Sequence, residues 1–234
     1  MAVQVVKYFL LQGYSHTQIT ILTPYVGQIL KILNVMKSTM SDVNAYISEL
    51  DREELMRNAE DEEDAFINNT KDYSGRHCVR CASIDNFQGE ESDIIVVSLV
   101  RSNAAGNIGF LKEEQRVNVL LSRARYGLSI IGNSSTLKHS AKGAHVWNPI
   151  IETLKKRGAI STKFPSICEL HPNDGVTLIS QPSDFVKFCP NGGCLRPCRA
   201  RLNCGHVCPM VSDFEPYLIL KFYYFCISFK KYFL

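Results

Sequence analysis

The sequence lacks several features that would assign it to a functional class at once. It contains no G-x-x-x-x-G-K-[ST] phosphate-binding loop, no acidic Walker B strand and no internal repeat. A complete P-loop nucleoside triphosphatase and a repeat protein are therefore both excluded for these 234 residues.

Signals for secretion or membrane insertion are also missing. The first residues, MAVQVVKYFLLQG, place Lys7 in an amphipathic pattern without a cleavage site. Near the other end, Lys221 and Lys230 leave only residues 222–229 uncharged between them, whereas a membrane-spanning helix needs about 20. We therefore expect an intracellular chain with no membrane partner, whose nine cysteines are reduced and available for metal ligation.

The composition is that of an ordinary folded domain. Hydrophobic residues make up 45% of the chain, and its length allows one large domain with a small appendage. Lys and Arg number 26 against 23 Asp and Glu, which gives a formal net charge of +3. This mild excess permits a nucleic-acid partner but does not argue for one.

Strands and helices alternate along residues 1–160. The run DIIVVSLV (93–100) is apolar and β-branched almost throughout, as a strand covered on both faces needs. The alternation predicts an α/β fold with a parallel sheet and helices on both faces. The expected strands are 18–25, 79–84, 93–100 and 128–131, and the expected helices are 1–12, 27–33, 117–124 and 147–156.

The segment RVNVLLSRARYGLSIIGN (116–133) carries arginines on a predicted helix. Val117, Leu120 and Leu121 recur at helical spacing, and Gly127 is expected to cap the helix before a short buried strand. Arg116 and Arg123 are seven residues apart and share a face. Such a pair is either solvated or faces an anion.

The rest of the chain divides by composition. Within the first domain (1–160), residues 41–76 include DREELMRNAEDEEDAF, whose eight acids and two arginines predict a solvent-exposed helical insertion or a mobile loop. After residue 160, prolines and cysteines become frequent and helical periodicity ends. We expect a linker at 161–188, a cysteine module at 189–211 and an atypical aromatic tail at 212–234.

Three polar segments follow the expected strands, at the sheet edge where open α/β folds bind ligands. Singly, each is a turn or a surface loop. Together, ILTPYVGQ (21–28), SIDNFQGEESDIIVVSLVRSN (83–103) and RVNVLLSRARYGLSIIGN (116–133) resemble motifs IV, V and VI of superfamily 1 helicases of the Upframeshift and Senataxin type. The resemblance covers about residues 1–160 and implies a RecA-like lobe.

The resemblance also implies a nucleotide site. Tyr25 would pack on the adenine ring, because an aromatic face stacks on a base with limited specificity. Gln88 and Gly89 would lie near the nucleotide and the nucleic-acid backbone, and Gly89 would let a main chain approach closely. Glu91 would contact the ribose hydroxyls, and Gln28 is also assigned to nucleotide binding.

Arginines supply the positive charge of the implied site. Arg123 matches the arginine finger of the family, and Arg101 would make a second contact to the γ-phosphate. A guanidinium is always charged and can fork onto two phosphate oxygens during phosphoryl transfer. We place Gln88 with these two arginines as catalytic candidates. Arg116 and Arg125 are either supporting cations or surface residues, and Asp85 is expected to order its loop.

The missing phosphate loop and Walker B strand belong to the first of the two RecA-like lobes in this family. The resemblance therefore implies that ATP and Mg²⁺ would be held mainly by that other lobe, and that these residues are inactive alone. It also implies RNA as the nucleic-acid partner, with DNA as the alternative, and a cytoplasmic or nuclear location that includes RNA granules.

Soft metal ligands are concentrated in CPNGGCLRPCRARLNCGHVC (189–208). Glycines and prolines turn the chain between them, which suits tetrahedral zinc, and such a segment would fold only with its metal. Cys168 and His171 could add a pair, or be surface residues. For Cys78 and Cys81, which alternate faces of a strand, a structural role is favoured. The six candidate ligands are Cys189, Cys194, Cys198, Cys204, His206 and Cys208.

The cysteine module resembles an NFX-type zinc finger, on the pattern LNCGHVCP (202–209). Helicase motifs followed by such a module resemble the NFX-type zinc finger-containing helicases, a group associated with RNA silencing. The segment from Ser212 departs from that pattern, with one cysteine and nine aromatics in 23 residues, and we interpret it as a truncated or mis-spliced reading.

Two functions from other classes compete with the motor lobe. The domain could be a scaffold for a zinc module that binds nucleic acid or protein without catalysis. Because NFX-type arrays resemble RING-like fingers, the zinc segment could also recruit ubiquitin-ligase partners.

Overall fold

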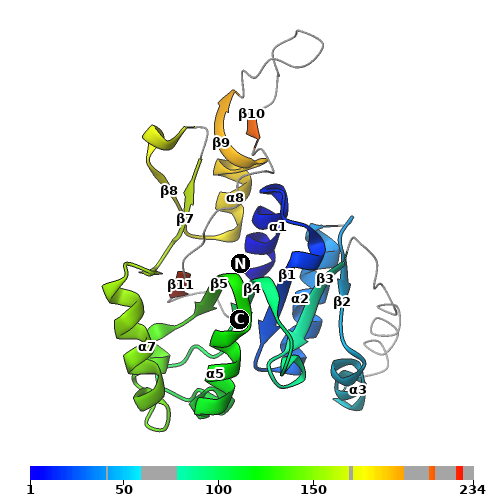
Figure 1. Cartoon of the computed structure of the whole chain (residues 1–234), viewed down its shortest axis with the longest axis vertical. Helices are drawn as coiled ribbons and strands as arrows, with labels where there is room; N and C mark the ends of the chain where they lie inside the picture. Colours follow the sequence, from blue (N-terminus) through cyan, green and yellow to red (C-terminus); the bar gives the residue numbers. More distant parts are fainter. Residues whose placement is uncertain (41, 59–77, 169–170, 198–210, 214–224, 229–234) are drawn as a thin grey trace.

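The computed structural model of the chain describes residues 1–40, 42–58, 78–168, 171–197, 211–213 and 225–228. One sheet carries seven of the strands, in the order β2-β3-β1-β4-β5-β11-β6. Every neighbouring pair in this sheet is parallel, which confirms the expected α/β RecA-like fold (Figure 1). Its strands are β1 (Ile19–Thr23), β2 (Asn44–Tyr46), β3 (Cys78–Ser83), β4 (Ser92–Ser98), β5 (Ala124–Gly132), β6 (Ile160–Ser161) and β11 (Phe225–Ser228).

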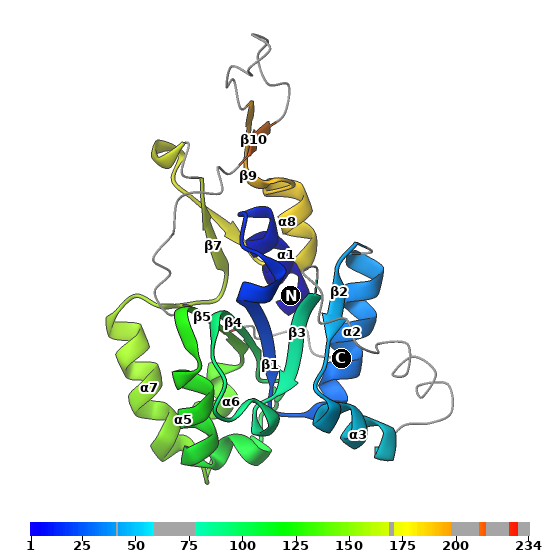
Figure 2. The same cartoon turned by 45° about the vertical axis from the view of Figure 1, so that its right-hand side comes forward.

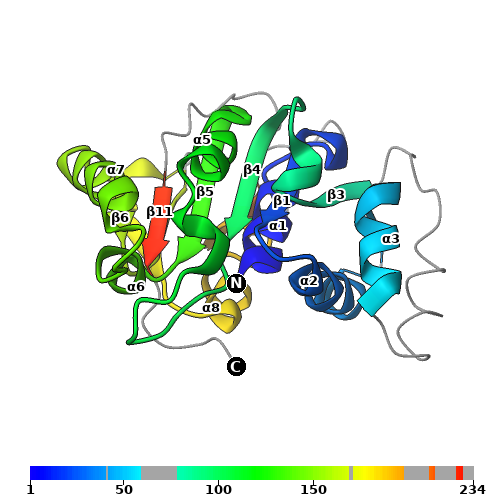
Figure 3. The same cartoon turned by 90° about the horizontal axis from the view of Figure 1, so that it is seen from below.

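Helices cover both faces of the sheet (Figure 3). Successive strand residues point to opposite faces, so Ile21 of β1 packs with α1 and α2, while Leu22 packs with α5 and α7. The central strand β4 is buried throughout except at Asp93, as its apolar run predicts. The helices are α1 (Ala2–Leu11), α2 (Val26–Thr39), α3 (Glu49–Asn58), α5 (Glu114–Ser122), α6 (Ser134–Lys138), α7 (Ala144–Lys156) and α8 (Pro182–Phe188).

The arginine helix begins and ends earlier than the sequence predicts. Helix α5 ends at Ser122, with Arg123 as its C-cap, and Gly127 lies inside β5 instead of capping the helix. The strand begins early because Ala124 pairs with Ser92 of β4, which gives these backbone groups sheet hydrogen bonds. The prediction that Gly127 ends the helix was wrong.

The described part of the acidic segment packs against the domain. It contributes β2 to the sheet edge, and α3 buries Asp51 (0% exposed), Arg52 (6%) and Leu55 (3%). A solvent-exposed helical insertion or a mobile loop was expected here. Residues 59–77 lie outside the described part.

A hairpin and a helix occupy residues where a linker was expected. Strands β7 (Phe164–Ile167) and β8 (Val176–Ile179) are antiparallel, and α8 follows them. Ring centroids of Phe164 and Phe185 lie 5.3 and 5.7 Å from that of Tyr8 on α1, so this unit shares a core with the first helix. Strand β9 (Gly192–Pro197) then pairs with β10 (Val211–Asp213) beyond α8, at the end of the molecule opposite α3 and α5 (Figure 2).

Part of the aromatic tail joins the main sheet. Residues of β11 pair with β5 on one side and with β6 on the other. The origin of this tail as a truncated or mis-spliced reading stays a prediction.

Candidate functional site

Tyr25 and Arg101 form the centre of a first cluster, at the carboxyl ends of β1 and β4. The Arg101 guanidinium lies 4.8 Å from the Tyr25 ring centroid, and its Nε donates to the Tyr25 hydroxyl at 3.1 Å. Tyr25 in turn donates to the carbonyl of Ile108 at 3.1 Å. The phenol is therefore held in place, and its face already contacts a cation.

A sharp turn aims Arg101 at this tyrosine. Its backbone N–H donates to the carbonyl of Leu99 at 2.7 Å, which closes a three-residue turn around Val100. Val100 has a φ of 64°, which is strained for a β-branched residue. Such strain is typical of functional positions, where surrounding structure holds it.

Arg116 belongs to the same cluster, but its charge is compensated. Its Nε donates to Asp85 at 2.8 Å and its guanidinium lies 3.1 Å from Glu113. It also stacks 4.4 Å from the centroid of Phe110, which lies 5.7 Å from the Tyr25 ring. Arg116 thus joins the Asp85 loop to α5. We refer to Tyr25, Asp85, Arg101, Phe110 and Arg116 as the carboxyl-end cluster.

A second cluster lies at the amino ends of β4 and β5. Arg125 donates to Glu91 at 3.1 Å, and this hydrogen bond and charge raise the pKa of Arg125 above its ordinary value. Glu90 forms an ion pair with Arg80 of β3. Gly89, with a φ of 85°, turns the chain just before these acids, and Gln88 beside it is exposed. We refer to Glu90, Glu91, Arg123 and Arg125 as the amino-end cluster.

Arg123 differs from Arg116 and Arg125 in its partners. Its guanidinium donates to the carbonyl of Val119 at 3.2 Å, to the carbonyl of Glu90 at 3.3 Å and to the hydroxyl of Ser122 at 3.0 Å. All three acceptors are neutral. Within the described residues, no carboxylate lies within ion-pair distance of Arg123, so its positive charge is held in position without being compensated.

The loop between β3 and β4 explains why there are two clusters. It leaves the carboxyl end of β3 at Asp85 and returns to the amino end of β4 before Ser92. The seven residues of β4 separate the two ends by roughly 20 Å along the strand. The structure therefore brings Tyr25 together with Arg101 and Arg116, and Glu91 together with Arg125, but it does not bring Tyr25 to Arg123.

Asp51 holds the start of this loop, a role that was not predicted from the sequence. Its carboxylate accepts from the backbone N–H of Ser83 at 3.3 Å and from the side-chain amide of Asn86 at 2.8 Å. It also accepts from the Ser48 hydroxyl at 2.9 Å. One of eight acids in an acidic run could be distinguished only by its position one helical turn after an N-terminal Ser48.

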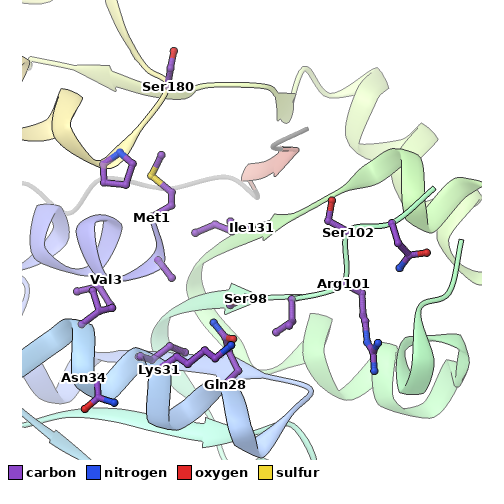
Figure 4. Close-up of a pocket in the computed structure, with 16 residues that line it drawn as sticks. Met1, Val3, Gln28, Lys31, Asn34, Ser98, Arg101, Ser102, Ile131 and Ser180 are labelled. Atoms are coloured by element: carbon purple, nitrogen blue, oxygen red, sulfur yellow. The ribbon is translucent and has the colours of Figure 1, made fainter. Parts of the chain in front are cut away.

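Gln28 and Arg101 line a cavity of about 880 Å³ between α1, α2 and the end of β4 (Figure 4). Lys31 of α2 and Ser102 also face it, and Met1 and Ser180 close its far side. The cavity is therefore mixed in polarity, with two cations at its wall.

This chain is similar to known proteins over most of its length. The AAA domain family model matches residues 1–135, more than half of the chain. The human NFX1-type zinc finger-containing protein 1 is 39% identical over 206 residues, 88% of this chain. The chain belongs to the AAA domain family of superfamily 1 helicases. Its match to the human protein places it in the NFX1-type group.

Other superfamily 1 helicases are similar over a shorter range. The regulator of nonsense transcripts 1 homolog of Arabidopsis thaliana is 34% identical over 153 residues, which are 65% of this chain. The ATP-dependent helicase NAM7 of Saccharomyces cerevisiae is 33% identical over 149 residues, or 63%. The chain spans 9, 10 and 12% of the human, plant and yeast proteins, respectively.

The cysteines of this helicase domain fall into distinct environments. Cys81 of β3 is buried, with its Sγ 3.8 Å from the sulfur of Met36, and burial together with Asp51 raises its pKa to about 12. Such a thiol packs as a small apolar group. Cys189 is also buried and contacts the Ser166 hydroxyl at 3.3 Å; burial raises its pKa.

One cluster of potential metal ligands occurs among the described residues. Donor atoms of Cys168, His171 and Cys194 all lie within 4.8 Å of one another. Cys194 was a predicted ligand, and Cys168 with His171 was the optional pair. Cys198, Cys204, His206 and Cys208 lie outside the described residues.

No helix in the described part of the helicase domain is long and apolar enough to cross a membrane.

Proposed function

We propose that this domain is the second motor lobe of an ATP-dependent RNA helicase, with Arg123 as its arginine finger. The observation that carries this proposal is the set of neutral acceptors around the Arg123 guanidinium. An arginine whose charge is fixed in place but not compensated can stabilise an approaching γ-phosphate without first breaking an ion pair.

The chemistry follows from the guanidinium group. In phosphoryl transfer, negative charge spreads over the equatorial oxygens, and a forked cation can contact two of them. The phosphate cradle and the Mg²⁺ ligands would come from a first RecA-like lobe, which is the principal partner we propose. Arg123 would reach across the cleft between the lobes.

The amino-end cluster would complete the nucleotide contacts. The ion pair with Arg125 holds the Glu91 carboxylate at this end of the sheet, where it could accept from ribose hydroxyls. Gly89 and Gln88 are exposed on the turn beside it, so a nucleotide could approach their backbone.

The carboxyl-end cluster offers a second kind of contact. Tyr25 presents an aromatic ring and Arg101 a cation next to the cavity that Gln28 lines. We assign Tyr25 and Gln28 to contacts with a nucleic-acid base and Arg101 to a contact with a backbone phosphate. The Arg101 side chain would move off the Tyr25 ring when a base stacks on that ring. RNA is the proposed nucleic acid, because a relative is named for nonsense transcripts, and DNA is the alternative.

Substitution of Arg123 tests the proposal in a helicase chain that contains both lobes. We expect Arg123→Ala to lower RNA-stimulated ATP hydrolysis by about 10³- to 10⁵-fold, as loss of an arginine finger does in other nucleoside triphosphatases. RNA binding, measured by fluorescence anisotropy, should be unchanged. The matched control is Arg57→Ala on the exposed face of α3, which should hydrolyse ATP normally.

Two results would contradict the assignment. Unchanged hydrolysis in Arg123→Ala would show that the charge is not used in the chemical step. A loss of RNA binding equal to the loss of hydrolysis would instead make Arg123 a nucleic-acid contact and favour the binding module without catalysis.

A further inference from the structure

Three soft donor groups converge from separate elements at the far end of the hairpin. Cys168 directly follows β7, His171 is the residue before a short turn at Pro172–Asp174, and Cys194 lies on β9. The last ligand is 23 residues from the imidazole in sequence. All three side chains are partly exposed, so an ion could reach them from solvent.

The spacing of the donor atoms matches a tetrahedral zinc ion. With Zn–S near 2.3 Å and Zn–N near 2.0 Å, two tetrahedral ligands of these types lie about 3.5 Å apart. The His171 Nδ1 lies 3.6 Å from the Cys168 sulfur and 3.3 Å from the Cys194 sulfur. Two edges of a tetrahedral face therefore have the expected length, and the third, between the two sulfurs, is no longer than 4.8 Å.

We propose that Cys168, His171 and Cys194 bind a zinc ion that clamps the β7–β8 hairpin to β9. Both clamped elements already rest on α1, the hairpin through Phe164 and Tyr8, and β9 through a hydrogen bond from Gln12 to the carbonyl of Gly192. The ion would fix the direction in which the chain leaves the helicase domain at β9. This proposal does not rest on the ATPase role of Arg123.

Cys189 is the neighbouring thiol that the structure uses differently. Its sulfur contacts the Ser166 hydroxyl, which contacts the Tyr8 hydroxyl at 3.1 Å, in the buried core between α8 and α1. Cys189 was itself a predicted zinc ligand, so its removal does not isolate the three proposed ligands. Cys81 is buried on β3 with its Sγ 3.8 Å from the sulfur of Met36, and Cys81→Ala is therefore the matched control.

The test measures zinc bound per chain in the full-length protein, by mass spectrometry of the metal after purification in buffer with zinc chloride. We expect Cys168→Ser, His171→Ala and Cys194→Ser each to lose one equivalent relative to the unsubstituted chain, and Cys81→Ala to lose none. His171→Cys should retain the ion, because a thiolate can replace the imidazole. Circular dichroism of each variant reports whether the domain is folded.

A second readout separates ligation from loss of structure. Cobalt added to the metal-free chain should give the absorption of a tetrahedral thiolate site, reduced in His171→Ala and preserved in Cys81→Ala. Zinc content that is unchanged in all three ligand variants would overturn the proposal. So would thiol mapping under non-reducing conditions that finds Cys168 and Cys194 joined in a disulfide.

Discussion

Two arginines on one helix, seven residues apart, have opposite electrostatic environments. Arg116 near the start of α5 contacts Asp85, Glu113 and the Phe110 ring. Arg123 at its end contacts only neutral acceptors among the described residues. Arg116 therefore links parts of the domain through ion pairs, whereas the charge of Arg123 is left uncompensated. Ion-pair partners, more than position on a helix face, decide which arginine can meet an external anion.

The largest predicted difference between the two is catalytic. In a two-lobe helicase, we expect Arg123→Lys to lower the rate of ATP hydrolysis by on the order of 10³-fold, because an ammonium cannot fork onto two phosphate oxygens. Arg116→Ala should lower the rate less than about tenfold, since the ion pair between Arg116 and Asp85 is partly exposed and such surface ion pairs contribute little energy. Single-turnover hydrolysis measures both, and equal losses would erase the distinction.

The second prediction concerns the loop that connects the two clusters. Asp51→Ala removes the acceptor for Ser83 and Asn86, and it leaves a buried N–H without a partner. We expect the free energy of unfolding to fall by about 1–3 kcal/mol in urea titrations. Glu53→Ala, an exposed acid on the same helix, should change it by less than about 0.5 kcal/mol. Equal effects would mean that Asp51 does not anchor the loop.

Much of the fold follows from the sequence because its strands are strongly patterned. The β-branched run of β4 and the strand–helix alternation predict a parallel sheet, and the sheet is there. The end of α5 was misplaced because Ala124 has no local strand signal; its pairing with Ser92 decides its conformation. A tertiary contact overrides local propensity at this position.

The division of the site into two clusters was not predictable from the same patterns. The rule that ligands gather at carboxyl ends places Asp85 correctly, but Glu91 is six residues further on and has returned to the amino end of β4. Sequence spacing does not reveal where a loop reverses along the sheet. Asp51 was missed for a related reason, because its partners Ser83 and Asn86 are more than 30 residues away.

The third prediction disturbs the carboxyl-end cluster alone. Gly109 has a φ of 56°, and a Cβ added there would overlap the Tyr25 hydroxyl. We expect Gly109→Ala to cost about 1–2 kcal/mol of backbone strain, to displace the Tyr25 ring and to weaken RNA binding. Gly27→Ala, with nothing within 4 Å of its added Cβ, is the control and should be neutral or stabilising. Urea titration and RNA anisotropy measure the two effects, and a Gly109→Ala chain as stable and as tight-binding as Gly27→Ala would contradict the prediction.

The smallest predicted effect comes from weakening the ion pair between Arg116 and Asp85. Asp85→Asn removes the negative charge 2.8 Å from the Arg116 Nε but keeps an acceptor oxygen and leaves Glu113 in place, so stability should fall by less than about 1 kcal/mol. If charge compensation is what separates the two arginines, the released Arg116 becomes able to contact phosphate. The slope of log affinity against log salt for single-stranded RNA should then steepen by about 0.7. Glu152→Gln on α7 makes the same charge change away from the cluster, and the comparison fails if it steepens the slope equally.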